Sequence, residues 1–385
     1  MRYESARLSD FSVPEASKRQ SMDAGFFTLA LILLAMGVVM VLSSSYARAY
    51  YDPGNVTGGN GAYYFLRQLI FALLGLGAML LASRLPMDFY RRYAFHFLGL
   101  TLVLLMLVPI IGVKANGSRR WLGVGGLTLQ PSELAKLAVI LSFSLLTCRF
   151  QGKMRSFQYG ILPFLAILGI IIGLLILEPH FSASIIIIVI GGVMMFLGGV
   201  GLGWFIAALG SVFAAVAVLL AFFPYASSRI TTWRDPFSSS SDEGYQIVQS
   251  LYSIGSGGLS GLGLGGSRQK FLYLPEEHND FIFAVACEEL GFIGAALILT
   301  LFALLILRGY WIALHCRERY DFLVCTGIST LLAIQVFLNV AVVTNLVPCT
   351  GISLPFFSYG GTALLIQLGE MGIILSASRT ILAEK

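Results

Sequence analysis

The sequence predicts an all-α polytopic membrane protein, with about ten transmembrane helices and a large extracytoplasmic loop between the seventh and the eighth. Of the 385 residues, 57% are hydrophobic and 12% are charged, whereas about a quarter of the residues of a soluble domain are charged. The mean hydropathy is +0.83. Charge-free runs such as 24–42 and 182–200 match the roughly 20 residues that cross a bilayer. A soluble enzyme, a nucleic-acid-binding domain and a disordered chain are therefore excluded.

The net charge and the cysteines add two constraints. A net charge of +5 indicates retained cytoplasmic ends and attraction to anionic membrane lipid, not binding of nucleic acid. The five cysteines are odd in number, scattered and without a Cys-x-x-Cys pair, so they predict neither a disulfide framework nor a metal site. We interpret them as packing residues.

Apolar runs separated by short polar breaks define the predicted spans. They lie at about 24–43, 69–83, 94–113, 132–149, 160–177, 182–199, 204–223, 281–307, 322–344 and 360–378. The segment before the first span is too polar for a cleaved signal and has no convincing small-residue cleavage site. We therefore expect the first span to be a retained helix.

The distribution of Lys and Arg gives the expected orientation. If the N-terminus is cytoplasmic, the inner segments carry more of the 25 basic residues than the outer loops do, as the positive-inside rule requires. The chain then divides into a cytoplasmic N-terminal tail (1–23), transmembrane helices 1–7 (24–223), a large extracytoplasmic loop (224–280), and transmembrane helices 8–10 with a short cytoplasmic C-terminus (281–385).

The loop 224–280 is far longer than the usual connection, and loops of this length tend to carry functional sites. Within it, 245–254 has apolar residues near helical spacing, which predicts a short amphipathic helix at the membrane interface or, equally, a solvated loop helix. The glycine-rich stretch 255–266 contains Gly-x-Gly-x-x-Gly, but a dinucleotide site requires a βαβ unit. We interpret these glycines as a flexible or tightly turning backbone near a ligand.

The strongest chemical signal is the acidic cluster that ends this loop. It places Glu276, Glu277, His278 and Asp280 within five residues, where the chain re-enters the membrane. The partial positive charge of a helix N-terminus favours an ionised carboxylate at the start of the eighth span. Such a carboxylate can accept a proton from a hydroxyl as a general base. The alternative is that Asn279 or Asp280 acts as a simple N-cap.

Two basic residues precede the acidic cluster. Arg268 and Lys270 are candidates to hold phosphates, as a planar fork and as a point charge. They are also candidates merely to neutralise the cluster.

A second constellation lies in the outer loop before the fourth span. It contains Arg119, Arg120 and Trp121, followed by Glu133 and Lys136. A proline opens the predicted helix and Glu133 lies in its first turn, as helix-start rules expect. Glu133 and Lys136 form an i,i+3 pair, and an ionisable group inside a span marks a pathway or a site by default. The alternative is a mutually neutralised pair that stabilises the bundle.

A third constellation, 345–361, joins the last two spans. It reads NLVPCTGISLPFFSYGG and includes Ser358. Irregular backbone of this kind is tolerated in a membrane protein where it is buried or lines a cavity, although an ordinary turn with interfacial aromatic residues fits as well. In the neighbouring spans, Glu288, Glu289 and Glu370 each need a partner, which the sequence does not identify.

These three constellations, in this order on ten spans, resemble the shape, elongation, division and sporulation (SEDS) family of bacterial membrane proteins. The motifs that carry the resemblance are NGSRRWLG (116–123), QPSELAKLA (130–138), GYQIVQSLYSIGSGGLSGLGLG (244–265), YLPEEHNDFIFAVACEELGF (273–292) and LPFFSYGG (354–361). The Asn-Gly-Ser-Arg-Arg-Trp run of the first motif and the stretch that follows Ser-Tyr-Gly-Gly look more like the division and sporulation members than the elongation members. One departure is the segment 179–183, which reads PHFSA where relatives commonly have Pro-Asp-x-Gly-Thr.

The resemblance implies a peptidoglycan glycosyltransferase of the bacterial cytoplasmic membrane that polymerises lipid II, with a class B penicillin-binding protein and other division proteins as partners at the septum. It implies that Asp280 is the catalytic residue and that Glu133 and Lys136 are a polar pair in a central cavity. The other substrate-binding candidates are Arg119, Arg120, Trp121, Arg268, Lys270, Glu276, His278 and Ser358. The sequence establishes no cofactor, and participation of a divalent cation is left open.

In the mechanism that we expect, Asp280 deprotonates the acceptor's GlcNAc 4-hydroxyl, which attacks the anomeric carbon of the donor's MurNAc with inversion and loss of undecaprenyl pyrophosphate. The basic candidates would stabilise the leaving charge. Two alternatives are a lipid II flippase and a non-catalytic scaffold of the division machinery. A flippase needs ionisable groups through the depth of the membrane, whereas here they crowd the predicted outer side.

Overall fold

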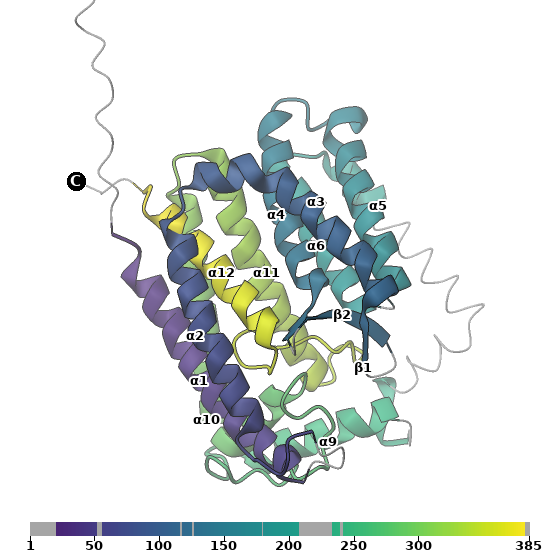
Figure 1. The fold of residues 1–385 in the computed structure, drawn as a ribbon, viewed down its shortest axis with the longest axis vertical. Helices are drawn as coiled ribbons and strands as arrows, with labels where there is room; N and C mark the ends of the chain where they lie inside the picture. The colour runs from purple at the N-terminus through teal and green to yellow at the C-terminus, as the bar shows by residue number, and fades with distance from the viewer. Residues whose placement is uncertain are drawn as a thin grey trace, which may run out of the picture.

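The structure, a computed structural model, describes residues 21–51, 56–115, 118–124, 127–178, 180–207, 233–238 and 242–381. Within these ranges, nine helices are long and apolar enough to cross a membrane (Figure 1). They are α1 (Ala24–Tyr50), α2 (Tyr63–Arg84), α3 (Met87–Ile111), α4 (Pro131–Arg149), α5 (Leu162–Leu177) with the π-helical turn before it (Phe157–Ile161), α6 (Phe181–Gly198), α10 (Ile282–Leu314), α11 (Arg319–Val343) and α12 (Gly361–Ser378). The protein is an all-α polytopic membrane protein, as predicted. The predicted seventh span, 204–223, and the predicted N-terminal tail fall largely outside the described residues.

The helices differ most from the predicted spans at their ends. The second span is predicted at 69–83, whereas α2 begins at Tyr63. Arg67 and Gln68 interrupt the apolar run, and yet Gln68 is fully buried and donates a hydrogen bond to the carbonyl oxygen of Ser358, 3.2 Å away. A polar side chain is accommodated within a span where it finds a partner inside the protein. The helix therefore starts earlier than its apolar residues indicate.

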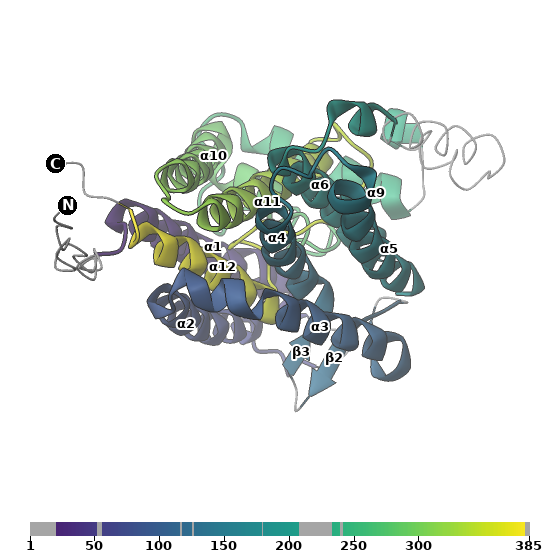
Figure 2. The same ribbon diagram turned by 90° about the horizontal axis from the view of Figure 1, so that it is seen from above.

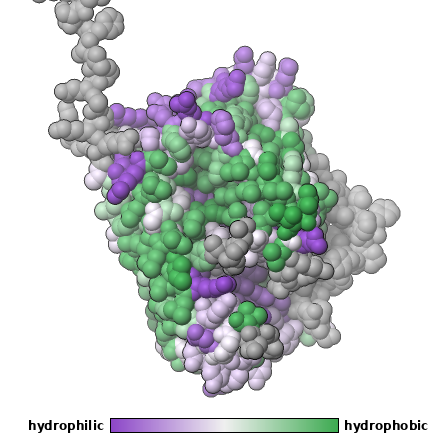
Figure 3. Space-filling view, viewed as in Figure 1, coloured by the Kyte–Doolittle hydropathy of each residue, from purple (hydrophilic) through white to green (hydrophobic). Residues whose placement is uncertain are grey.

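Three helices form the centre of the bundle. The buried share of the spanning window is 83% in α4, 72% in α12 and 67% in α11, and no more than 50% in the other six described spans. Seen from above, these three lie among the outer helices α2, α3, α5 and α10 (Figure 2). Apolar side chains make a broad belt on the face drawn in Figure 3, with polar surface beyond it at both ends. A bilayer requires such a belt of a protein that spans it.

A small antiparallel sheet, which the sequence patterns do not predict, lies at one end of the bundle. Its strands, in the order β1-β2-β3, are β1 (Val113–Ala115), β2 (Ser118–Val124) and β3 (Leu127–Leu129). Val113 pairs with Trp121 across the first two strands. Two of the strands have three residues, too few to show the alternation that identifies a strand in a sequence. The sheet positions Arg119, Arg120 and Trp121 on β2.

The helix predicted at 245–254 is confirmed as part of α9 (Asp242–Gly257). It lies across the lower end of the bundle in Figure 1. Ile247 is buried on one face of α9, and on the same face the hydroxyls of Ser250 and Ser253 donate hydrogen bonds to backbone carbonyl oxygens of α11 and α10. This face is thus packed against the bundle.

α10 is interrupted close to its start. At Gly291 the backbone adopts φ 66° and ψ −170°, outside the helical region. Four backbone hydrogen bonds join the interrupted part to the glycine-rich loop after α9. They run from the amides of Leu262, Gly263, Phe292 and Ile293 to the carbonyl oxygens of Glu288, Glu289, Gly258 and Leu259, respectively, over 2.9 to 3.2 Å. Since unpaired backbone groups are costly inside a bundle, the loop stabilises the interruption.

The close approach of the two segments explains two glycines of this loop. A Cβ atom at Gly257 would lie 2.1 Å from the carbonyl oxygen of Cys287, and one at Gly261 would lie 2.2 Å from that of Glu289. The positive φ of Gly258, Gly261, Gly263 and Gly265 confirms a tightly turning backbone, and a ligand near it stays a prediction.

Two glycines of this loop separate the effect of close approach from that of backbone conformation. Gly261 and Gly263 both have a positive φ, +78° and +89°, but an added Cβ meets nothing within 4 Å at Gly263. Both Gly261→Ala and Gly263→Ala strain the backbone by about 1–2 kcal/mol, whereas Gly261→Ala adds a clash of about 1–3 kcal/mol. We predict that Gly261→Ala lowers the thermal unfolding midpoint of the detergent-purified protein more. Equal midpoints would show that the loop does not dock on α10 in this way.

Candidate active site

A polar cavity of about 410 Å³ lies at the end of the bundle that carries the sheet. Its walls come from α2, β2, β3, α4, α6, α11 and α12 and from two loop segments, 276–280 and 351–360. Seven predicted site residues line it, although they are far apart in the sequence: Arg120, Trp121, Glu133, Lys136, Glu276, Asp280 and Ser358. The four predicted residues that do not line it are Arg119, Arg268, Lys270 and His278.

Asp280 precedes α10 and is partly exposed to the cavity. No residue in the described part of the chain donates a hydrogen bond to its carboxylate. Phe281 occupies the N-cap position of α10, without a side-chain hydrogen bond. The alternative that Asn279 or Asp280 caps the helix is therefore wrong. The Asn279 side-chain amide instead donates to Glu276 Oε2, 2.6 Å away.

The surroundings of Asp280 shift its acidity toward neutrality. Burial raises the pKa of Asp280, as does the nearby charge of Glu276, whereas His278 and Arg120 lower it, and the resulting pKa is about 6. Burial disfavours the charged form of a carboxylate, and a neighbouring anion adds to that effect. At neutral pH the group is mostly ionised and is still basic enough to take a proton in a reaction.

The predicted pair of Glu133 and Lys136 is confirmed as an ion pair, with 2.7 Å between Lys136 Nζ and Glu133 Oε2. Both residues are buried, at 9% and 3% exposure, and both border the cavity in the first turns of α4. Glu370 of α12 is buried within electrostatic reach of the pair. A lysine has three donors, so the contact with Glu133 does not exhaust the binding capacity of Lys136.

Arg120 lies within electrostatic reach of two carboxyl groups, those of Asp280 and Glu178. Burial raises the pKa of Glu178 to about 8, although Arg120 opposes this, so Glu178 is mostly protonated at neutral pH. Burial, together with the charges of Arg120 and Lys136, lowers the pKa of His180 to about 3. Its imidazole is therefore neutral at physiological pH. His180 lies in the segment 179–183, whose sequence departs from the expected family pattern.

Three of the predicted residues outside the cavity are engaged elsewhere. Arg119 is exposed, and its guanidinium donates to a backbone carbonyl oxygen of α3. The side chain of Arg268 is exposed, and its backbone amide donates to Glu288 Oε1, 2.9 Å away. His278 is buried against the ring of Tyr64, with 4.8 Å between the ring centroids.

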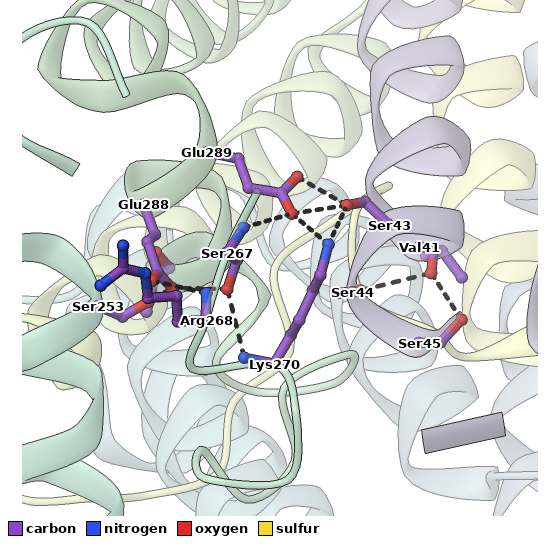
Figure 4. Close-up of polar contacts among 11 residues, drawn as sticks. Val41, Ser43, Ser44, Ser45, Ser253, Ser267, Arg268, Lys270, Glu288 and Glu289 are labelled. Carbon is purple, nitrogen blue, oxygen red and sulfur yellow. Dashed lines mark hydrogen bonds and ion pairs between the residues drawn. The ribbon is translucent and has the colours of Figure 1, made fainter. Parts of the chain in front are cut away.

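Lys270 lies in a buried polar cluster that links the loop after α9 to α1 and α10 (Figure 4). Its Nζ is 2.7 Å from Glu289 Oε1 and 3.1 Å from Ser43 Oγ, and Ser43 itself donates to Glu289. The adjacent Glu288 accepts hydrogen bonds from two serine hydroxyls and one backbone amide. These groups are the partners of Glu288 and Glu289 that the sequence leaves unidentified. Lys270 thus holds the loop in place, away from the cavity.

Removing the charge of Lys270 leaves Glu289 buried and unpaired. We predict that Lys270→Met lowers the free energy of unfolding by about 3–5 kcal/mol and that adding Glu289→Gln restores most of it. The control is Arg268→Met, which changes an exposed side chain and is expected to cost at most about 0.5 kcal/mol. The measurement is denaturant unfolding of the purified protein. A Lys270→Met protein as stable as the control would refute the structural role of the pair.

The sequence motifs leave out two uncharged polar residues of the cavity. Gln335 and Gln367 line it from within the spans α11 and α12, at 3% and 6% exposure, whereas Gln130, which also lines it, stands in the motif 130–138. A buried amide in a span is a weaker form of the signal that an ionised residue gives. A search of the predicted spans for glutamine would therefore have identified Gln335 and Gln367.

No group of three or more His, Cys, Asp or Glu side chains suited to a metal ion occurs in the part of the chain that the structure describes. A divalent cation that binds a phosphate in the cavity would find two further oxygen ligands there, the carboxylates of Glu276 and Asp280. Carboxylate and phosphate oxygens are the ligands that hard divalent cations prefer.

The model of the family described as "Cell cycle protein", which covers FtsW, RodA and SpoVE, matches residues 23–381. The chain belongs to this family. The SEDS membership that the motifs predict is thereby confirmed.

Individual relatives cover nearly the whole chain. Stage V sporulation protein E of Bacillus subtilis (strain 168) is 39% identical over 366 residues, which are 94% of this chain and 98% of that protein. A protein of Coxiella burnetii named probable peptidoglycan glycosyltransferase FtsW is 39% identical over 360 residues, 92% of this chain and 95% of that protein. The predicted enzyme class is thus confirmed at the level of the family.

Two solved structures share the fold. A chain in a structure on the coordination of polymerization and crosslinking by a peptidoglycan synthase complex matches with a TM-score of 0.77 and 29% identity, over 94% of this chain and 99% of that one. The rod shape determining protein RodA of Thermus thermophilus matches with a TM-score of 0.68 and 27% identity, over 94% and 98% of the two chains.

Proposed function

We propose that the protein polymerises lipid II into glycan strands, as a peptidoglycan glycosyltransferase of cell division or sporulation. The observation that carries this proposal is the Asp280 carboxylate, which borders a polar cavity at one end of an apolar helix bundle and accepts no hydrogen bond from the described residues. Lipid II joins a lipid chain, a pyrophosphate and a disaccharide, so its site must meet the membrane, phosphates and sugar hydroxyls together. The family and the names of its members support the class of reaction.

In the proposed reaction, Asp280 accepts the proton of the acceptor's GlcNAc 4-hydroxyl as the oxygen attacks C1 of the donor's MurNAc. The new bond forms on the face opposite the leaving group, so the configuration at C1 inverts. The bond between C1 and the pyrophosphate oxygen breaks, and undecaprenyl pyrophosphate departs with the electron pair. One carboxylate suffices, because pyrophosphate needs little protonation to leave.

Arg120 and Lys136 are the proposed partners of the leaving group. Both line the cavity together with Asp280, and cations aimed at a developing negative charge stabilise a transition state. Arg120 offers the planar fork that matches phosphate oxygens. Trp121 and Glu276 complete the proposed substrate site. The participation of a divalent cation stays a prediction.

The proposed orientation places both termini in the cytoplasm and the cavity on the outer side, at the division septum, where lipid II presents its disaccharide. A class B penicillin-binding protein is the proposed partner, since a matched chain belongs to a complex that coordinates polymerization with crosslinking. That other division proteins also bind this protein stays a prediction.

The decisive variants are Asp280→Asn and Asp280→Ala, which keep a side chain of similar or smaller size and remove the base. We predict a loss of about 10²–10⁴-fold in glycan-strand formation from purified lipid II, measured for the full-length protein with its class B partner. Folding is checked by thermal unfolding of each variant. Equal polymer from all three proteins would remove Asp280 from the mechanism. Absence of polymer from well-folded wild type would favour the flippase or the scaffold.

The acidity of Asp280 sets the pH dependence of the reaction. A general base works when it is deprotonated, so the rate is expected to rise with pH through the pKa of about 6 and to level off above it. Arg120 lowers the pKa of Asp280. Arg120→Met is therefore predicted to move the midpoint of the pH–rate profile to higher pH, whereas Arg119→Met, outside the cavity, leaves it in place. Identical midpoints in the two variants would contradict the charge coupling.

A further inference from the structure

The position of the Asp280 carboxylate depends on the backbone that carries it. No described residue bonds the carboxylate itself, and the residue lies before the first turn of α10. A base must lie within about 2.6–3.2 Å of the group whose proton it takes, and a misplacement of about 1 Å can cost roughly 100-fold in rate. The contacts of the surrounding backbone therefore decide whether the base is in place.

Three consecutive carbonyl oxygens of this turn are held by donors from other parts of the chain. Tyr359 N donates to His278 O over 2.9 Å, Ser358 Oγ to Asn279 O over 2.7 Å, and Asn339 Nδ2 to Asp280 O over 2.8 Å. Two of the donors belong to the segment 351–361 and the third to α11. The predicted substrate ligand Ser358 therefore uses its hydroxyl proton within the protein.

Asn339 holds two segments at once. Its side chain is fully buried in α11, and its amide nitrogen donates to Asp280 O over 2.8 Å and to Ile352 O over 2.7 Å. Both hydrogens of the amide are thus used. Gly351, which precedes Ile352, has a φ of +64°, and a Cβ atom added to it would lie 3.2 Å from Asp280 Oδ2. The same amide fixes the Asp280 turn and the backbone that faces its carboxylate.

We propose that Asn339 is a positioning residue for the glycosyl transfer. Its amide donates hydrogen bonds to both Asp280 O and Ile352 O. The two bonds hold the carboxylate where the acceptor's hydroxyl can give up its proton. The inference rests on the proposed function of Asp280 as the base. Asn339 does not border the cavity, so it acts through Asp280 and not on the substrate. A neutral side chain with two donors is needed, because an ionised aspartate or a leucine at this position offers none.

The first test needs no substrate. The sample is the full-length protein in lipid nanodiscs. We predict that Asn339→Ala speeds hydrogen exchange of a peptide that covers 276–284 by about tenfold. The backbone amides of this turn open together once the two hydrogen bonds from Asn339 are lost. Asn339→Leu is the second variant. Leucine fills the space, so a water molecule cannot replace the amide and restore the bonds. A variant that does not fold is recognised by its thermal unfolding, and the other then decides.

The matched control is Thr330→Val. Thr330 lies earlier on the same helix, and its hydroxyl hydrogen-bonds the hydroxyl of Tyr310 over 2.9 Å. The control removes a hydrogen bond between α11 and α10 without touching the Asp280 turn. Exchange of the peptide 276–284 is expected to stay at the wild-type rate.

The second test is kinetic and uses lipid II with the class B partner. We predict that Asn339→Ala lowers kcat by about 10–100-fold and changes KM by less than about threefold, because the base moves while the substrate contacts remain. The midpoint of the pH–rate profile is expected to move to lower pH, since a mobile carboxylate is better hydrated. A merely structural role would leave this midpoint in place.

The outcomes of the two tests are separable. Unchanged exchange in both Asn339 variants overturns the inference whatever the activity. Faster exchange with an unchanged kcat and pH midpoint overturns the positioning role and leaves only a structural contact. The proposed function fails on its own if Asp280→Asn is as active as wild type or if well-folded wild type makes no polymer. In that case the exchange experiment still decides whether Asn339 holds the Asp280 turn.

Discussion

Hydrogen bonds that tie non-helical backbone to the helix bundle determine how this protein is built. Three such segments, 258–263, 276–280 and 351–361, lie against one another or against helices, and each finds donors and acceptors there. Gln68 and Gln367 extend the pattern, because their side chains bond the backbone of 351–361 from α2 and α12. Backbone groups buried away from water are costly when they lack a partner. These bonds therefore fix the loops, and the loops place the polar groups of the cavity.

The buried carboxyl groups in and beyond the cavity differ in how they are compensated. Glu133, Glu277 and Glu289 each form an ion pair with a lysine or an arginine, at 2.7, 3.1 and 2.7 Å. Glu178 is buried, and its raised pKa of about 8 makes it mostly neutral at physiological pH. Asp280 combines access to the cavity, no hydrogen bond from a described residue and a pKa of about 6. That combination of properties is typical of a general base.

Sequence patterns predict well what depends on neighbours along the chain. Apolar runs predict the nine described spans, and the i,i+3 spacing predicts the pair of Glu133 and Lys136. The same reasoning fails for Lys270, which resembles a phosphate ligand beside an acidic cluster but pairs with Glu289 on another element. Asn339 is a single polar residue in an apolar run, and its role depends on two distant carbonyl oxygens. No local spacing carries that information.

The most direct test of the proposed mechanism is a structure of the full-length protein with its class B partner and bound lipid II. The measured quantity is the distance from the Asp280 carboxylate to the 4-hydroxyl of the acceptor's GlcNAc. We predict about 2.6–3.2 Å, with the donor's pyrophosphate against Arg120 and Lys136. An acceptor sugar bound outside the cavity, or one whose 4-hydroxyl lies well beyond that distance while the donor is in place, would contradict Asp280 as the base.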